Sequence, residues 1–254
     1  MVSTTLPKAS EEQNENKKTP TNVFGIDYTK STEELVKSSN PNERLVGLDR
    51  QFRAEPWKKS EICQPLMETV LEISTINGKI DTDKAMFLVD STFRWEMFEY
   101  LLSKIKVTPR KYNKLLRDAW TTGIGTGRAI QYFVFADPEL IMNKWERNTI
   151  DKMPDVVKLY RGCSKNELNE EDGNHLGISW TTSREIAEFF AFRFNGVGED
   201  PRVVVSCDVP KEEIVAFFKY PEYECICLDI CADDVIIETE EPTEYYEKFM
   251  GKRA

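Results

Sequence analysis

The segment GISWTTSREIAEFFAFRF, residues 177–194, decides the fold class of the second half of this chain. Its first residues, 177–180, have the pattern of a short strand. Thr182 and Glu185 then have the spacing of a capping box, which marks the first turn of a helix. The segment therefore predicts a strand that runs directly into a helix over residues 184–194.

The predicted helix has an apolar stripe with a cation inside it. At about 100° per residue, one face collects the large apolar side chains. These are Ile186, Phe189, Phe190 and Phe194. Arg193 falls within the stripe, where a guanidinium is costly unless an external anion or an internal carboxylate meets it. The sequence leaves both partners open.

Short strand patterns lie on both sides of this helix, and helical patterns precede them. The expected strands cover residues 156–160, 177–180, 202–207, 214–218, 224–229 and 234–238. Because one helix interrupts them, we expect an antiparallel α+β domain over residues 151–254. Residues 23–150 have helical periodicity, clearest over 84–105, 108–120 and 137–150. Residues 1–22 are polar and are expected to form a disordered tail.

Composition excludes several classes of site. The chain of 254 residues has one histidine, His175, so zinc sites with two or three histidines are excluded and we expect no metal. Six cysteines are too few for a disulfide scaffold, which indicates a reducing compartment. Because neither an apolar run of about 18 residues nor a signal-peptide pattern occurs, we expect no membrane partner. The expected location is the cytoplasm, or a target cell reached without a secretory signal.

The net charge of −10 is unevenly distributed. Residues 1–150 have 22 Lys and Arg against 21 Asp and Glu, whereas residues 151–254 have 12 against 23. An acidic half repels polyphosphate backbones and attracts basic protein surfaces, although solubility alone would explain it equally well. A basic cluster in the first half could instead hold a nucleic-acid strand. It consists of Lys104, Lys106, Arg110, Lys111, Lys114 and Arg117.

Two further motifs accompany the central segment. Arg161 ends an apolar strand between Tyr160 and Gly162, where an arginine suits phosphate binding with close backbone approach. A surface salt bridge is the plainer interpretation of Arg161. After Pro221, strand alternation places Glu222 and Glu224 on one face that becomes core two residues later. Two carboxylates this close raise the pKa of one or both, a frequent property of active sites.

The order Arg…Ser-x-Thr…Glu-x-Glu resembles the arginine-serine-glutamate class of ADP-ribosyltransferases. The resemblance covers roughly residues 154–238, and residues 1–150 have none. Its matching positions are Tyr160-Arg161, Ser179-Trp180-Thr181, Ala187, Phe190, Glu222 and Glu224. Trp180 departs from that family's Ser-Thr-Ser motif. The resemblance implies a catalytic domain of two packed, mainly antiparallel sheets with few helices. This domain would follow the helical N-terminal region that periodicity predicts.

The resemblance also implies that NAD is the substrate. Arg161 would bind its pyrophosphate, with Arg193 as a second phosphate contact. The backbone of Gly162 would hold the nicotinamide amide, and Phe190 would stack on the nicotinamide ring.

The remaining implied roles concern the reaction itself. Ser179 would orient Glu224, which would bond the ribose 2′-hydroxyl and stabilise an oxocarbenium-like transition state. Glu222 would position and deprotonate the acceptor, because a guanidinium needs a carboxylate beside it. Lys219 and Tyr220 would lie in the acceptor-recognition loop.

We therefore expect a mono-ADP-ribosyltransferase that modifies an arginine of a protein target and releases nicotinamide. A toxin, an effector or a phage-host conflict protein would have this activity. Its helical half would recognise the target or bind an antitoxin or regulator. Two alternatives stay open: transfer to RNA or DNA, and a non-enzymatic NAD-binding or partner-binding module on the same fold.

Overall fold

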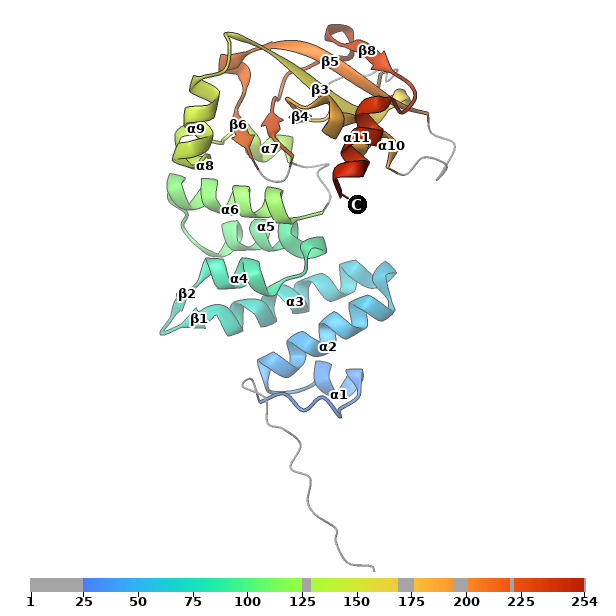
Figure 1. Cartoon of the computed structure of the whole chain (residues 1–254). Helices are drawn as coiled ribbons and strands as arrows, with labels where there is room; N and C mark the ends of the chain where they lie inside the picture. Colours follow the sequence, from blue (N-terminus) through green and yellow to red (C-terminus); the bar gives the residue numbers. More distant parts are fainter. Residues whose placement is uncertain (1–24, 125–128, 169–175, 194–200, 220–221, 254) are drawn as a thin grey trace, which may run out of the picture. The chain divides into compact units, whose positions relative to one another are not determined.

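The computed structural model of the chain describes residues 25–124, 129–168, 176–193, 201–219 and 222–253 (Figure 1). They belong to two compact units, which divide between Asp81 and Thr82. The helices after Thr82 therefore share a unit with the sheet, whereas we expected the boundary near residue 150. The predicted disordered tail, His175 and Tyr220 lie outside the described residues.

The first unit consists of helices and one short hairpin. Its elements are α1 (Thr32–Val36), α2 (Pro41–Ala54), η1 (Pro56–Lys58), α3 (Lys59–Ser74), β1 (Thr75–Ile76) and β2 (Lys79–Ile80). Asn77 and Gly78 connect the two strands, with φ angles of 50° and 73°. Asn-Gly is favoured in two-residue hairpins because both residues tolerate positive φ. The hairpin interrupts a region that we expected to be helical throughout.

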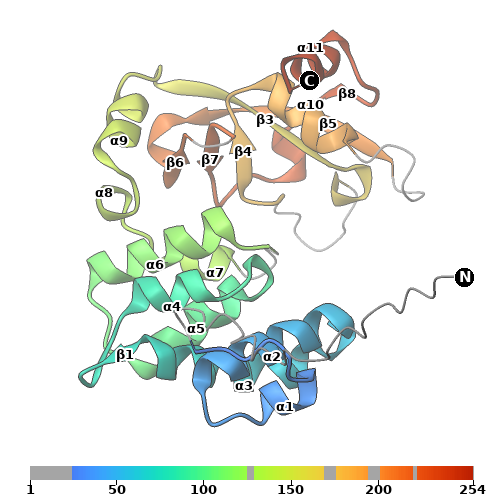
Figure 2. The ribbon, with the colours of Figure 1, turned by 60° about the horizontal axis from the view of Figure 1, so that its bottom comes forward.

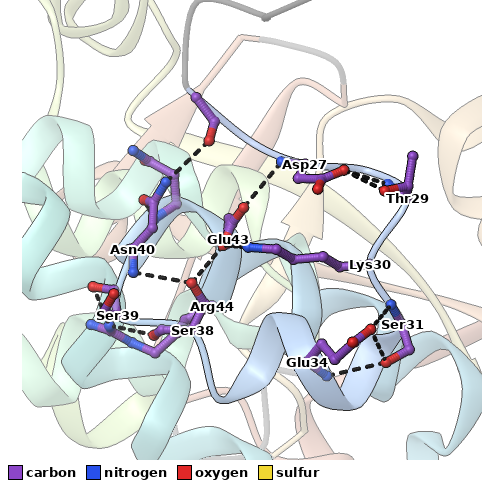
Figure 3. A network of polar contacts seen from close by, with 12 residues as sticks. Asp27, Thr29, Lys30, Ser31, Glu34, Ser38, Ser39, Asn40, Glu43 and Arg44 are labelled. Atoms are coloured by element: carbon purple, nitrogen blue, oxygen red, sulfur yellow. Dashed lines mark hydrogen bonds and ion pairs between the residues drawn. The ribbon is translucent and has the colours of Figure 1, made fainter. Parts of the chain in front are cut away.

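Glu43 of α2 holds the chain that precedes the helix (Figure 3). Its buried carboxylate accepts hydrogen bonds from Lys30 Nζ at 2.6 Å, from the Ser38 hydroxyl, and from the Asp27 backbone N–H at 3.1 Å. These bonds, that from Lys30 first, lower the pKa of Glu43 from 4.5 to about 2. The ionised carboxylate thus contributes to the stability of this unit.

Glu43→Gln is expected to lower the melting temperature at pH 7, because the amide cannot balance the Lys30 ammonium. The lowered pKa means that this contribution is present above pH 4.5 and is lost as the pH falls through about 2. The difference between wild type and variant should therefore close over that range. Circular-dichroism melts from pH 2 to 7 measure it, with exposed Glu61→Gln as the control. Equal melting temperatures at pH 7 would contradict the role assigned to Glu43.

The helices of the second unit begin directly after the division. They are α4 (Thr82–Leu88), α5 (Arg94–Lys104), α6 (Pro109–Thr122), α7 (Ile130–Phe133), α8 (Pro138–Ile141) and α9 (Lys144–Asp151). The start of α6 confirms the prediction, since Thr108 caps it and Pro109 occupies its first turn. The expected helix over 84–105 is instead divided by a 3₁₀ turn, η2 (Ser91–Phe93), which Asp90 caps. Asn143 likewise starts a new helix within residues 137–150.

The six predicted strands are present and form one antiparallel sheet in the order β6-β7-β4-β3-β5-β8. Their bounds are β3 (Val156–Ser164), β4 (Ser179–Thr181), β5 (Arg202–Pro210), β6 (Ala216–Phe218), β7 (Glu224–Ile226) and β8 (Ile236–Thr239). The α+β class is therefore confirmed. We expected two packed sheets, but β3 and β4 pair at Tyr160 and Thr181 and join the strands into one. Among the described residues, this is the one pair in register between β3 and β4.

Helix α10 (Arg184–Phe192) packs against β3 and β5. Gly162 permits the close approach, since a Cβ atom there would lie 2.2 Å from the Ala187 carbonyl oxygen. Ser183 caps α10 by accepting from the Ile186 N–H, whereas we expected Thr182 to do so. The last helix, α11 (Glu244–Arg253), lies beside α10 (Figure 2).

Across the described residues, no helix combines the length and the apolar character needed to cross a membrane.

Candidate active site

A pocket of about 150 Å³ opens where β3, β4 and β7 meet the first turns of α10. Its lining consists of Tyr160, Arg161, Gly162, Ser179, Trp180, Thr181, Ile186, Ala187, Phe190, Arg193, Arg202, Glu222 and Glu224. Of the predicted site residues that the structure describes, all except Lys219 are among them. The three sequence motifs therefore share one pocket, although Arg161 and Glu224 lie 63 positions apart along the chain.

Glu224 is the first residue of β7 and is half-buried. Its Oε1 atom accepts a hydrogen bond from the Ser179 hydroxyl, as we expected. Its Oε2 atom accepts one from the indole Nε1 of Trp120, at 2.8 Å. The carboxylate is thus held at both oxygens, by one residue of the sheet and one of α6.

Burial raises the pKa of Glu224 from 4.5 to about 7. The hydrogen bonds from Ser179 and Trp120 favour the anion and oppose this shift. The neighbouring Glu222 raises the pKa, and Arg161 lowers it. Near neutral pH, both protonation states of Glu224 are therefore populated, which is typical of a functional carboxyl group.

Glu222 also lines the pocket, but it does not lie on a strand beside Glu224 as the predicted alternation required. It precedes β7 and lies in a turn in which Tyr223 has a φ of 49°. The turn is fixed to β4, since the Thr181 hydroxyl donates to the Glu222 carbonyl at 2.8 Å. The left-handed residue between the two glutamates, rather than period-two alternation, brings both carboxylates to the pocket.

Arg161 of β3 has a partner within the protein. Its Nη1 atom donates to the Ser179 carbonyl and its Nη2 atom to Glu167 Oε2, each at 3.0 Å. The salt bridge that we considered is present, yet only 18% of the Arg161 side chain is exposed. Gly177 leaves room for the guanidinium, because a Cβ atom there would lie 2.2 Å from Nη2. Arg161 is thus held in a fixed orientation at the pocket.

Arg193 does not lie in a buried stripe. The buried residues of α10 include Ile186 and Ala187, and Phe190 is half-buried. Arg193 is exposed, with its guanidinium 4.4 Å from the centre of the Phe190 ring. Of the predicted stripe, Ile186 is buried and Phe194 lies outside the described residues. The prediction was wrong for Phe189, Phe190 and Arg193, because Gly162 allows the alanine face of α10 to pack closely on the sheet.

A third arginine of the pocket, Arg202, was missed by sequence reasoning. It starts β5 and gave no local signal beyond its charge. Together with Arg161 and Arg193 it gives the pocket lining three arginines beside its two glutamates, within the half of the chain that is acidic by composition. The net charge of residues 151–254 therefore does not predict which charged side chains line the pocket.

Trp120 is the other contributor that sequence reasoning missed. We interpreted Trp57, Trp95, Trp120 and Trp145 as core residues. This is correct for Trp95 and Trp120, which are 9% and 8% exposed, and wrong for Trp57 and Trp145, which are 75% and 46% exposed. The hydrogen bond of Trp120 spans 104 residues of sequence, and no spacing pattern reports such a contact.

No family model matches the sequence, and no curated protein or solved structure is significantly similar to the chain. The chemistry of the pocket is therefore the guide to what the protein does.

Lys219 lies at the end of β6 rather than in the pocket lining. Its ammonium is 4.1 Å from the centre of the Trp145 ring, and its backbone N–H points to Glu146. The side chain is thus directed onto α9.

A larger hollow of about 380 Å³ lies elsewhere on the sheet, along β5 and β8. Its acidic lining includes Asp208, Glu213, Asp229 and Asp234. Carboxylates repel the phosphates of a dinucleotide, so the pocket with three arginines in its lining is the better candidate for such a ligand. Within the described part of the chain, no group of three or more His, Cys, Asp or Glu side chains could hold a metal ion.

Proposed function

We propose that this protein is a mono-ADP-ribosyltransferase that transfers ADP-ribose from NAD to an arginine of a protein target and releases nicotinamide. One observation carries the proposal: Glu224, with its pKa near 7, is held by Ser179 in a pocket that arginines also line. Such a pocket suits a substrate that develops positive charge at one atom and carries a pyrophosphate farther along.

In this proposal, the bond between ribose C1′ and nicotinamide breaks, and its electron pair leaves with nicotinamide. The ribose becomes oxocarbenium-like, and the ionised Glu224 stabilises that charge and accepts a hydrogen bond from the 2′-hydroxyl. A guanidinium nitrogen of the target then forms the new bond to C1′. Its proton goes to Glu222, which also orients the acceptor.

The arginines and the helix supply the binding of NAD. Arg161 and Arg193 would bind the pyrophosphate, and Arg202 offers a third contact. The Gly162 backbone would hold the nicotinamide amide, with Phe190 against the ring. A volume of about 150 Å³ is small for a whole ligand, since drug-sized ligands occupy about 300–1,000 Å³. We therefore assign the pocket to the nicotinamide-ribose half of NAD.

Gly177→Ala is expected to raise the KM for NAD about tenfold while changing kcat little. The added methyl group would collide with the Arg161 guanidinium and displace it, which removes binding made in both the ground state and the transition state. Steady-state kinetics of nicotinamide release measure this effect. Gly251→Ala is the control, since a Cβ atom at that glycine meets nothing within 4 Å. An unchanged KM in folded Gly177→Ala would show that Arg161 does not bind NAD.

Incubation with NAD labelled in the adenylate part tests the function itself. The purified chain is mixed with cell lysate, and the labelled products are treated with protease or with nuclease. Label that protease releases and that neutral hydroxylamine removes slowly, as from arginine, supports the proposal. Label that nuclease releases would instead favour nucleic acid as the acceptor. Absence of both transfer and nicotinamide release would favour the non-enzymatic binding module.

Contacts within the protein weaken the nucleic-acid alternative. Two of the six clustered cations are used in ion pairs: Arg117 pairs with Glu146, and Lys114 pairs with Asp83 and Asp118. Every residue that lines the pocket belongs to the second unit. We therefore assign the first unit to recognition of the target, of an antitoxin or of a regulator, in keeping with a toxin, an effector or a phage-host conflict protein.

A further inference from the structure

The carboxylate of Glu224 has two fixed donors, which come from different parts of the second unit. The Ser179 hydroxyl of β4 donates to Oε1, and the Trp120 indole of α6 donates to Oε2 at 2.8 Å. A terminal carboxylate torsion is broad when it is unrestrained. Donors on the two oxygens restrict this torsion. Trp120 therefore helps to fix the orientation of the Glu224 carboxylate.

We propose that Trp120 is a positioning residue for Glu224, and that helix α6 is through it a working part of the transferase. The inference rests on the proposed function. Helix α6 lies outside the three motifs, and in this proposal it holds the Glu224 carboxylate, which stabilises the reacting ribose.

Helix α6 is itself firmly held, as a positioning element has to be. Arg117, one turn before Trp120, makes a bidentate ion pair with the buried Glu146 of α9, at 2.6 and 2.7 Å. Its guanidinium also lies 4.9 Å from the centre of the Phe218 ring of β6. The orientation of α6 is therefore fixed against the same part of the sheet that carries Glu224.

The indole ring is fixed by aromatic neighbours. Trp120 packs edge-on against Trp95, with ring centres 6.3 Å apart, and against Phe133, with ring centres 5.0 Å apart. Only 8% of Trp120 is exposed. The ring cannot turn away without disrupting that cluster, so its N–H is preorganised toward the carboxylate.

The chemistry of the donor favours positioning over blocking. An indole N–H can only donate, so it bonds to the lone pairs of the carboxylate and favours the ionised form. A carboxylate has about four lone-pair sites, and Ser179 and Trp120 use two of them. Room remains for the ribose 2′-hydroxyl. Trp120 is also absent from the lining of the pocket, so it does not occupy the place of the substrate.

The surroundings of Glu224 set the expected pH response. The groups that face it are the Glu222 carboxylate from the preceding turn, the Arg161 guanidinium from β3 and the neutral Cys225 thiol of β7. Removal of the indole N–H leaves Ser179 as the remaining hydrogen-bond donor among the described groups. The pKa of Glu224 should then rise further, and the ionised fraction at neutral pH should fall.

Trp120→Phe tests the proposal in the full-length protein. At pH 7 we expect kcat for nicotinamide release to fall at least tenfold, because a hydrogen bond to a charged group is lost. The KM for NAD should change less than about threefold. The acidic limb of the kcat profile, near pH 7 in the wild type, should move up by about one pH unit, so that activity partly recovers at pH 9.

Two further proteins separate the hydrogen bond from other effects of the substitution. Trp57→Phe makes the same exchange at an exposed tryptophan of the first unit, and it should leave the pH profile in place. Benzothienylalanine at position 120 keeps the ring shape without the N–H, and it should reproduce the Trp120→Phe profile even if phenylalanine disturbs the fold. An unshifted profile with that isostere, or higher activity than wild type, would overturn the proposal. Inactivity of the wild type would instead overturn the proposed function.

Discussion

Glu224→Gln is expected to abolish ADP-ribose transfer and NAD hydrolysis together, each by about 100-fold or more. The amide has the shape of the carboxylate but no negative charge to oppose the positive charge on the ribose. Because burial raises the pKa of Glu224 to about 7, the ionised form destabilises the folded protein above its unfolded pKa of 4.5. The variant should therefore melt no lower than the wild type at pH 8, and the melting curves check that its loss of activity does not come from unfolding.

Nicotinamide release and circular-dichroism melts together measure this result. Glu212→Gln, at an exposed position after β5, is the control and should retain normal kinetics. Near-normal NAD turnover in folded Glu224→Gln would disprove the proposed mechanism. In the wild type, kcat should rise with pH through about 7, because the proposed reaction uses the ionised carboxylate of Glu224.

Glu222→Gln is expected to abolish transfer to arginine while slow NAD hydrolysis continues. In the proposed mechanism, loss of nicotinamide uses Glu224, Ser179 and the phosphate contacts, whereas attack by a guanidinium also uses a carboxylate beside the acceptor. With agmatine as acceptor, the modified agmatine and the free nicotinamide are measured in one reaction. We expect at least a 100-fold loss of the first product and less than about a tenfold loss of the second.

The other outcomes of this assay have distinct meanings. If agmatine is still modified at the wild-type rate, arginine is the wrong acceptor and nucleic acid becomes the stronger candidate. If both products disappear together in a folded protein, Glu222 belongs to the NAD site rather than to the acceptor site. Glu213→Gln, which changes a glutamate outside the pocket, is the matched control.

Much of the second unit could be predicted because its signals are local. Thr108 and Pro109 mark the start of α6 through hydrogen bonds and a φ angle that involve only the first helical turn. The six strands could be predicted from short apolar runs between turn residues. Predicted ends were less accurate where two caps compete, as at Thr182 and Ser183, because neighbouring hydroxyls can each cap the same turn.

The packing of α10 could not be predicted from its periodicity. Helical spacing collects Ile186, Phe189 and Phe190 on one face, and it cannot show how closely the helix approaches the sheet. Because Gly162 has no side chain, α10 can approach β3 closely at this point. The helix must then present small side chains to the strand, and these are Ala187 and Ala191. Arg193 is thereby left exposed beside the pocket.

The sequence alone determined the class of the fold and the residue types of the site, because strands, caps and the order of Arg161, Ser179 and Glu224 depend on near neighbours or on chain order. Only the tertiary structure decided the rest: the turn that brings Glu222 and Glu224 to one pocket, the three arginines in its lining, and the hydrogen bond from Trp120. That bond joins residues 104 positions apart. A contact of this kind depends on how helix and sheet pack as whole elements, and no local pattern contains that information.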